Sequence, residues 1–178
     1  YIPGGHGKSP VDSLRLLASA AIPEISVANF DAICAEQFGI KSSSARSALT
    51  TMRGLGLYDI AGRNKFTASA AAQEWLDSGD DIALLRIVHC HMRFVGELLQ
   101  HVDSLKRAPS LHELAVSEYG VEAANKSTTS RIMQLLHGTG MIQEVAYAQY
   151  ETTTLGKRLL EELPLAMPKS ERERAAIL

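Results

Sequence analysis

Two stretches of the 178-residue chain carry the same pattern of residues at a fixed spacing. Residues 43–57 match residues 127–141, so that Gly56 corresponds to Gly140 at an offset of 84 residues. The same offset links further residues: Phe66 with Tyr150, and Trp75-Leu76 with Leu159-Leu160. Upstream the offset is 81, which places three additional residues in one loop of the second copy. Because a repeat of this length indicates a repeated structural unit, we predict two copies of one module.

The first copy has the residues that start and end three helices, a hairpin and a closing helix. Ser9-Pro10 starts the first helix, and Ile22-Pro23 ends it. Ser26 caps the second helix, which ends at Gly39; Ser42 or Ser43 caps the third, which Gly54 and Gly56 stop. The remaining elements are expected at 57–60 and 65–67 for the two strands, and at 70–76 for the last helix.

The second copy repeats this order. Ser110 is expected to cap a helix over 111–119, followed by a third helix over 126–136, strands at 141–145 and 149–153, and a closing helix over 155–163. Between the copies, apolar residues recur at steps of four and three from Leu84 to Leu105, which predicts one long helix. We rank a buried connector first and a dimer seam second.

The expected domains are therefore a first module at 10–79, a connecting helix at 80–106, a second module at 107–164 and a C-terminal tail or linker at 165–178. The tail is a mixed-charge run, typical of a solvated helix or linker. The chain starts at Tyr1 and not at Met, so we expect a processed or excised piece whose catalytic domain could lie elsewhere.

Three helices followed by a two-stranded wing resemble the winged helix-turn-helix family. The stretch from Ala32 through the Ser/Thr/Arg-rich helix to Leu57 resembles the helix-turn-helix of many bacterial regulators, and Tyr150–Leu160 is similar to the exit from the wing. The resemblance covers residues 10 to 164 and implies a mainly α fold with small β-wings, in two winged-helix modules joined by a long helix. Tandem winged helices also resemble the recognition parts of some restriction endonucleases and the kleisin-binding segregation proteins.

Positive charge gathers where this family meets DNA. The whole chain carries a formal charge of −2, but residues 40–66 hold five cations (Lys41, Arg46, Arg53, Arg63 and Lys65) against Asp59. This segment has a net charge of +4, and the remainder of the chain −6. In the DNA-binding form of the family the third helix enters the major groove and the wing touches the backbone or minor groove. The alternative reading of these residues is helix caps and a solvated face.

The second copy is electrically neutral over residues 120–150, where Lys126 and Arg131 balance Glu122 and Glu144. Such a helix can read bases with little attraction to phosphate, or contact a protein instead. The expected DNA-contacting residues of the two copies are Lys41, Ser43, Ser44, Arg46, Ser47, Thr50, Arg53, Arg63, Asn64 and Lys65 in the first, and Lys126, Thr128, Thr129, Arg131 and Gln134 in the second.

The sequence carries no pattern of an enzyme, a metal site or a cofactor site. The run His89-Cys90-His91 cannot converge on one metal from a helix, because neighbouring helical residues point about 100° apart. Phosphate-binding loops, zinc-protease helices, nucleophile elbows and the acidic-x-Lys pair of common nucleases are missing from the sequence. Two isolated cysteines favour a reducing setting, and there is no membrane-spanning run or signal peptide.

We therefore expect a non-enzymatic tandem winged-helix module that binds double-stranded DNA sequence-specifically, in the cytoplasm and associated with the nucleoid. It would be the recognition part of a restriction or defence enzyme, or a transcriptional regulator. Its expected partners are double-stranded DNA and either a second copy of the chain or a further domain. The alternatives are a winged-helix scaffold of the segregation-complex type and, less favoured because of the second copy, the dimerisation domain of a small-molecule methyltransferase.

Overall fold

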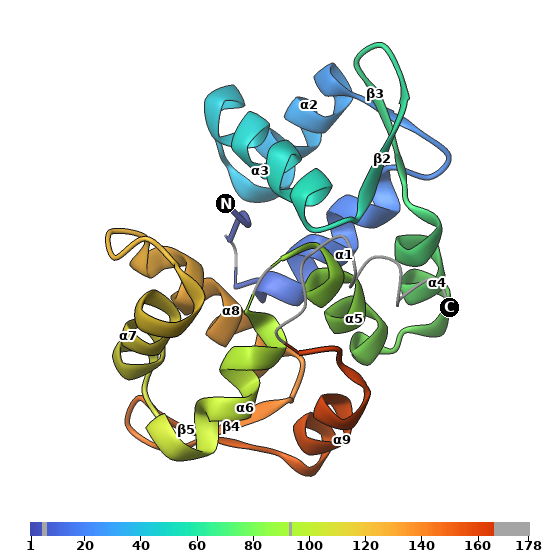
Figure 1. Ribbon diagram of the computed structural model, residues 1–178. Coiled ribbons are helices and arrows are strands. Elements are labelled where there is room, and N and C mark those ends of the chain that lie inside the picture. Colours follow the sequence, from blue (N-terminus) through green and yellow to red (C-terminus); the bar gives the residue numbers. More distant parts are fainter. Residues whose placement is uncertain (5–6, 93, 166–178) are drawn as a thin grey trace. The chain divides into compact units, whose positions relative to one another are not determined.

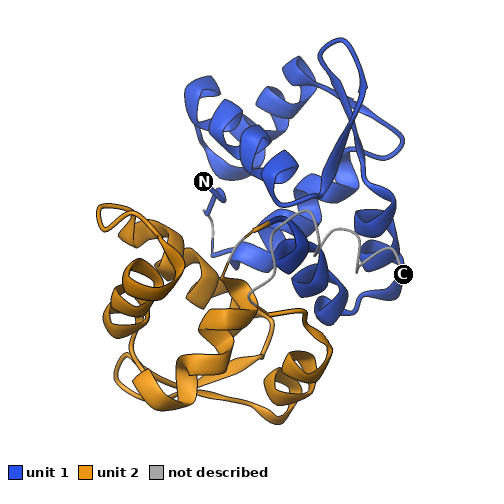
Figure 2. Cartoon of the chain, in the orientation of Figure 1, with its two compact units in different colours: residues 1–91 blue, residues 92–178 orange. Residues whose placement is uncertain are grey.

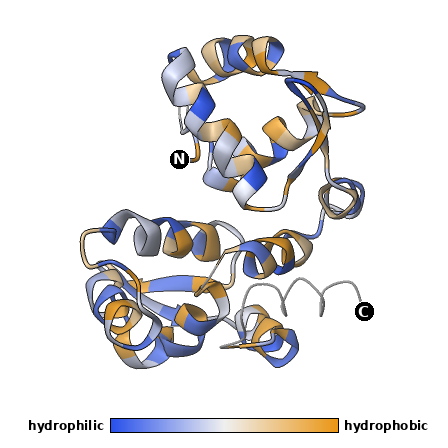
Figure 3. Cartoon of the chain, turned by 45° about the horizontal axis from the view of Figure 1, so that its top comes forward, coloured by the Kyte–Doolittle hydropathy of each residue, from blue (hydrophilic) through white to orange (hydrophobic). Residues whose placement is uncertain are grey.

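The computed structural model describes residues 1–4, 7–92 and 94–165. The described chain is mainly helical with two small antiparallel sheets, and it divides into two compact units, Tyr1–His91 and Met92–Leu178 (Figures 1 and 2). In both units the helices carry hydrophobic and hydrophilic residues side by side along their length (Figure 3). Each helix can therefore bury one face and leave the other to solvent.

Unit 1 contains the elements α1 (Pro10–Ala20), β1 (Ile25–Ser26), α2 (Val27–Phe38), α3 (Ser42–Gly54), β2 (Tyr58–Gly62), β3 (Lys65–Ala68), α4 (Ala70–Ser78) and α5 (Asp81–His91). Ser9 caps α1 in a capping box with Asp12, Ser26 caps α2, and Gly39 ends α2 in the left-handed conformation. These three signals lie where the sequence predicted them.

The sheet of unit 1 has the order β1-β3-β2, with both pairings antiparallel. Tyr58 of β2 lies opposite Ala68, and its ring stands edge-on to Phe30 of α2 with 6.1 Å between centroids. The hydroxyl of Tyr58 donates to the carbonyl of Leu17 in α1. Fully buried side chains from the helices, among them Leu14, Leu17, Phe30, Met52 and Trp75, complete the core. The hairpin is thereby fixed to α1 and α2 at its base, while its tip extends into solvent.

Unit 2 contains α6 (Val95–Leu105), α7 (Ala108–Tyr119), α8 (Lys126–Gly138), β4 (Ile142–Ala146), β5 (Gln149–Thr152) and α9 (Thr154–Glu162). Its sheet is the antiparallel pair β4-β5, joined to the end of α6 by the hydrogen bond from Tyr150 N to the carbonyl of the C-cap residue Lys106 at 2.9 Å. The core is built from fully buried residues such as Leu98, Leu99, Leu111, Ile132 and Leu136.

The bounds of the elements follow the offsets read from the sequence. Each of α3, β2, β3 and α4 has its counterpart 84 residues later in α8, β4, β5 and α9, and α2 has its counterpart 81 residues later in α7. The backbone conformations repeat as well, because Asn64 and Ala148 both have positive φ at the hairpin tips, 58° and 53°. Corresponding positions of the two units can therefore be compared residue by residue.

The structure differs from the expectation of a single helix over residues 80–106. Helix α5 ends at His91, and α6 begins at Val95. Phe94 has φ 75°, outside the helical region, and its ring lies 5.1 Å from that of Tyr119 in α7. The apolar stripe is divided: its first half is buried in unit 1 and its second half in unit 2. Two separate cores therefore replace the predicted continuous connector.

Two expected helix caps are also corrected. The N-cap of α3 is Lys41, and neither Ser42 nor Ser43. The side chain of Lys41 makes no capping hydrogen bond, and the hydroxyl of Ser42 donates to Asp31 of α2. Ser110 lies inside α7, which starts at Ala108 with Pro109 in its first turn. Proline there fits the first turn because the amide it lacks has no partner in a helix start. Of the expected tail, 166–178 lies outside the described residues.

Candidate nucleic-acid interface

Helix α3 separates its residues cleanly between core and surface. Ala45, Ala48, Leu49 and Met52 are buried against the rest of unit 1. The opposite face consists of small hydroxyl residues and two arginines and includes no acidic residue; it comprises Ser43, Arg46, Ser47, Thr50 and Arg53, all exposed. We call these five residues the α3 face. A helix face of this composition presents hydrogen-bond donors and positive charge to solvent.

Two of the three hydroxyls of the α3 face, those of Ser47 and Thr50, donate hydrogen bonds to their own helix. Ser47 Oγ donates to the Ser43 carbonyl at 3.3 Å, and Thr50 Oγ1 donates to the Arg46 carbonyl at 3.0 Å. A hydroxyl that donates in this way keeps its lone pairs and can still accept. The charged donors on this face are the guanidinium groups of Arg46 and Arg53.

The guanidinium of Arg53 is positioned by an aromatic ring. It lies over Phe66 of β3 with 5.7 Å between Cζ and the ring centroid. Such a contact holds the plane of the guanidinium and leaves its N–H edges free for an anion. Arg46 forms no ion pair with any residue that the structure describes. The α3 face thus offers one held and one unrestrained arginine.

The tip of the β2–β3 hairpin carries the three residues that the sequence singled out. Arg63 and Asn64 form the turn and are exposed, and Asn64 has the positive φ that a tight turn of this kind requires. Lys65 starts β3 and forms an ion pair with Glu24, which precedes β1. Both partners are about half exposed, so the pair contributes little to stability and can exchange for another anion.

Two acidic residues next to this surface were missed by the sequence reasoning. Glu24 reaches Lys65 across 41 residues, and Asp31 accepts a hydrogen bond from Ser42 at the start of α3. Both lie outside the segment 40–66 for which the charge was counted, and only the β1–β3 pairing and the α2–α3 packing bring them close. The positive charge that unit 1 presents is therefore smaller than the sequence count.

The remaining predicted residues of unit 1 lie at the start of α3. Lys41 is exposed at the N-cap position, and Ser44 is half-buried. The predicted residues of unit 1 thus fall on two elements, the first turns and outer face of α3 and the hairpin tip, which pack against each other through α3 and β2.

In unit 2 the structure corrects one predicted contact. Thr129 of α8 is only 2% exposed, and its hydroxyl is 3.1 Å from Nδ1 of His112 in α7. The other ring nitrogen of His112 is 3.0 Å from the carbonyl of Ala123, in the longer loop between these helices. Thr129 corresponds to the buried Ala45 of α3, which is the signal that could have placed it inward. It links α7, the loop and α8 and is not a surface residue.

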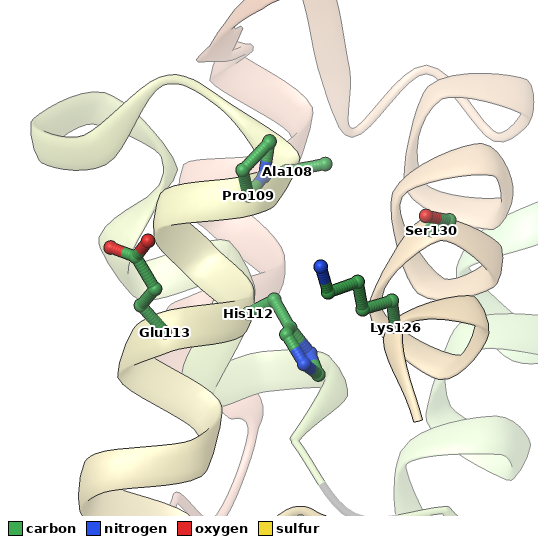
Figure 4. A pocket seen from close by; sticks show the side chains of 6 residues that line it. All are labelled: Ala108, Pro109, His112, Glu113, Lys126 and Ser130. Atoms are coloured by element: carbon green, nitrogen blue, oxygen red, sulfur yellow. The ribbon is translucent and has the colours of Figure 1, made fainter. Parts of the chain in front are cut away.

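The other predicted residues of α8 lie on or near its surface. Lys126 and Gln134 are exposed, whereas Thr128 and Arg131 are half-buried. Lys126 extends from α8 into a shallow pocket between α7 and α8, with its ammonium pointing toward the start of α7 (Figure 4). The pocket is also lined by Pro109, His112 and Ser130, and the carboxylate of Glu113 points away from it.

Corresponding positions of the two units differ mainly in charge. Arg46, Arg53, Arg63 and Lys65 of unit 1 are matched in unit 2 by the residues Ser130, His137, Tyr147 and Gln149. The ring of His137 lies against Tyr150, with 5.8 Å between centroids, as Arg53 lies over Phe66. Both units therefore hold this side chain against an aromatic ring, but the four cations of unit 1 have no Arg or Lys at the corresponding positions of unit 2.

The sequence run His89-Cys90-His91 belongs to the core of unit 1. His89 and Cys90 are buried, and the ring of His91 packs closely over Gly56, leaving no room for a Cβ there. In the described part of the chain no three His, Cys, Asp or Glu side chains are grouped as metal ligands would be. Among the helices that the structure describes, none is long and apolar enough to cross a membrane.

Comparisons of the chain with protein families, with curated proteins and with solved structures gave no match.

Proposed function

We propose that this chain is a tandem winged helix-turn-helix protein that binds double-stranded DNA in a sequence-specific manner. In this proposal α3 enters the major groove and the β2–β3 hairpin touches the backbone or the minor groove, as in the DNA-binding form of that family. The proposal is supported by the order of elements, in which two helices are followed by the third helix, a hairpin and a closing helix.

The observation that carries the proposal is the α3 face. Arg46 and Arg53 stand on an exposed helix face without an acidic residue, and Arg63 is exposed on the adjoining hairpin. Arginine binds phosphate oxygens and also reads guanine through paired hydrogen bonds. A face that only needed solubility would carry cations and acids intermixed, and the composition of this face favours an anionic partner.

Unit 2 contributes recognition with less phosphate attraction. Its α8 offers Lys126, Ser130 and Gln134 on the surface, and glutamine can form paired hydrogen bonds with adenine. We propose that unit 1 supplies most of the affinity and unit 2 adds specificity. The protein would act as the recognition part of a restriction or defence enzyme or as a transcriptional regulator. The oligomeric state in solution distinguishes these two roles, since a regulator of this size is expected to dimerise.

The first test is fluorescence anisotropy of a labelled random-sequence duplex at several salt concentrations. Neutralising about four phosphates gives a slope of log K against log[salt] near −4. The double variant Arg63→Ala/Lys65→Ala removes two of these contacts and should make the slope less negative by about 2. The matched control Lys157→Ala/Arg158→Ala removes two exposed charges from α9 and should leave the slope near that of the wild type.

Either of two results would contradict the proposal: absence of binding by the wild type at low salt, or an equal loss of binding in both double variants. The first result would favour a protein partner, and a pull-down with the whole chain would then be the next experiment.

Arg46 is expected to read a base. After selection of a preferred site, Arg46→Ala should weaken binding to that site by about 1–3 kcal/mol while changing binding to random duplex much less. The measurement is a competition of both duplexes for each protein. An equal loss for the two duplexes would assign Arg46 to a phosphate contact.

A further inference from the structure

The hairpin of unit 2 presents one aromatic side chain to solvent. Tyr147, in the turn between β4 and β5, is 93% exposed, whereas the neighbouring Tyr150 is half-buried beside His137. Phe30, Phe66 and Trp75 are buried in unit 1. Because the large apolar ring of Tyr147 is exposed, a binding partner that covers this ring with a flat surface would gain favourable contact energy.

The backbone holds this tip in one conformation. The carboxylate of Glu144 accepts a hydrogen bond from Ala148 N at 2.7 Å, and Ala148 adopts φ 53°. Ala146 and Gln149 pair across the hairpin, after an irregularity that begins at Glu144. Tyr147 is thus carried on a closed turn, and contact with a partner costs little backbone entropy.

The chemistry of the tip differs from that of its counterpart in unit 1. Tyr147 occupies the position of Arg63. Its neighbours Val145, Ala146, Ala148 and Gln149 carry no charge, and the one charged group at the turn is the carboxylate of Glu144, bonded to Ala148 N. A phosphate contact through a cation is therefore available at the unit 1 tip but not here. What this tip offers is the face of a phenol ring, which stacks on a nucleobase or packs on a deoxyribose.

We propose that Tyr147 is a DNA-contacting residue whose ring packs on a sugar, or on a base at an opened step, of the duplex that unit 2 binds; this inference rests on the proposed function. A protein partner is the less favoured occupant. A stable protein interface buries about 800 Å² on each side, and the exposed large apolar side chains of this hairpin are Val145 and Tyr147 alone among the described residues.

The test compares Tyr147→Ala, Tyr147→Phe and the control Gln143→Ala in the full chain, by anisotropy with a labelled duplex over a range of salt. Removal of a stacking ring should weaken binding by about tenfold. The salt slope should stay that of the wild type, because no charge is lost. Tyr147→Phe and Gln143→Ala should bind within about twofold of the wild type, since both keep the ring. Circular dichroism melting checks that each variant is folded.

A second readout uses Tyr147→Trp, whose fluorescence should be quenched when duplex DNA is added; Trp75 is buried and provides the same background in the wild type. If Tyr147→Ala binds like the wild type while Arg63→Ala/Lys65→Ala is impaired, the stacking role is wrong and DNA binding stands. If Tyr147→Phe is as weak as Tyr147→Ala, the hydroxyl and not the ring makes the contact. If the wild type binds no duplex, both proposals fail together.

Discussion

Arg53 and His137 occupy corresponding positions near the ends of α3 and α8, and each lies against an aromatic ring of the following hairpin. In both units the aromatic ring, Phe66 or Tyr150, restrains the orientation of the polar side chain that packs on it. Arginine is charged at every physiological pH, whereas histidine is a weaker cation. This is one of four corresponding positions on the α3 face and the hairpin at which unit 1 carries Arg or Lys and unit 2 does not.

Burial also changes the chemistry of two side chains inside unit 1. Burial raises the pKa of the Cys34 thiol to about 11, with a smaller contribution from the Asp31 carboxylate. The pKa of Tyr58 is raised as well, by burial first and by Cys34 second. Both groups are neutral in the folded protein at neutral pH, and both titrate at lower pH once the chain unfolds.

Stability is therefore expected to fall as the pH rises above about 9. Between the pKa of the unfolded thiol and about 11 the folded state binds more protons than the unfolded state, so the free energy of unfolding decreases with pH. Tyr58→Phe should lower the free energy of unfolding at neutral pH by about 1 kcal/mol, through loss of the bond to Leu17. It should also lose less stability at alkaline pH than the wild type.

The measurement is urea unfolding of the wild type, Tyr58→Phe and the control Tyr147→Phe at neutral pH and at several values above pH 9. A parallel alkaline decline in all three proteins would show that Tyr58 does not contribute to it.

At the scale of the elements, close packing at one glycine fixes α9 against the hairpin of unit 2. A Cβ at Gly156 would lie 2.2 Å from the carbonyl oxygen of Met141. That carbonyl also accepts the hydrogen bond from Thr153 N at 2.9 Å, and Thr153 caps the helix through Gly156 N. The backbone at Met141 therefore cannot move away from a Cβ at Gly156 without breaking the hydrogen bonds at the start of α9.

Gly156→Ala should therefore destabilise the protein by about 1–3 kcal/mol. Gly54→Ala is the matched control, because Gly54 ends α3 with no atom within 4 Å of the new Cβ. The control should be neutral or stabilising by up to about 1 kcal/mol, since alanine favours a helix. Thermal and urea unfolding of both variants measure the difference. Equal stability of the two variants would contradict the close packing at α9.

The order of the helices and hairpins could be predicted because short signals mark their ends, such as Ser9, Ser26 and Gly39. The break between α5 and α6 could not, because the apolar spacing continues through it and a positive φ at Phe94 leaves no mark in the pattern. The inward position of Thr129 was missed because threonine is mostly found on surfaces, although the offset of 84 pairs it with the apolar Ala45. The DNA-contact role of the α3 face remains a prediction.

At the scale of the whole molecule, each of the two units has its own buried core and its own sheet. Several permanent cations stand on the α3 face and hairpin of unit 1, whereas the corresponding surface of unit 2 is mostly uncharged. Duplicated geometry with unequal charge is consistent with different tasks for the two halves. The units can then be examined separately.

Residues 1–91 should fold alone, because a chain of this length exceeds the size below which small domains need additional stabilisation, about 40 residues. The fragment should keep most of the salt-dependent affinity for random duplex, while residues 92–178 should bind more weakly and with a shallower salt slope. Circular dichroism and anisotropy on each fragment measure both properties. Stronger salt-dependent binding by the second fragment would reverse the assignment of the two units.

The repeated plan of elements also bears on how the chain reaches its fold. Two similar hairpins in one polypeptide create the opportunity for a strand of one half to pair with a strand of the other. Each hairpin here closes over a two-residue turn, whereas an exchange would have to close a loop of about 84 residues, at a higher entropic cost. Because synthesis proceeds from the N-terminus, the first half can complete its sheet before its counterpart emerges.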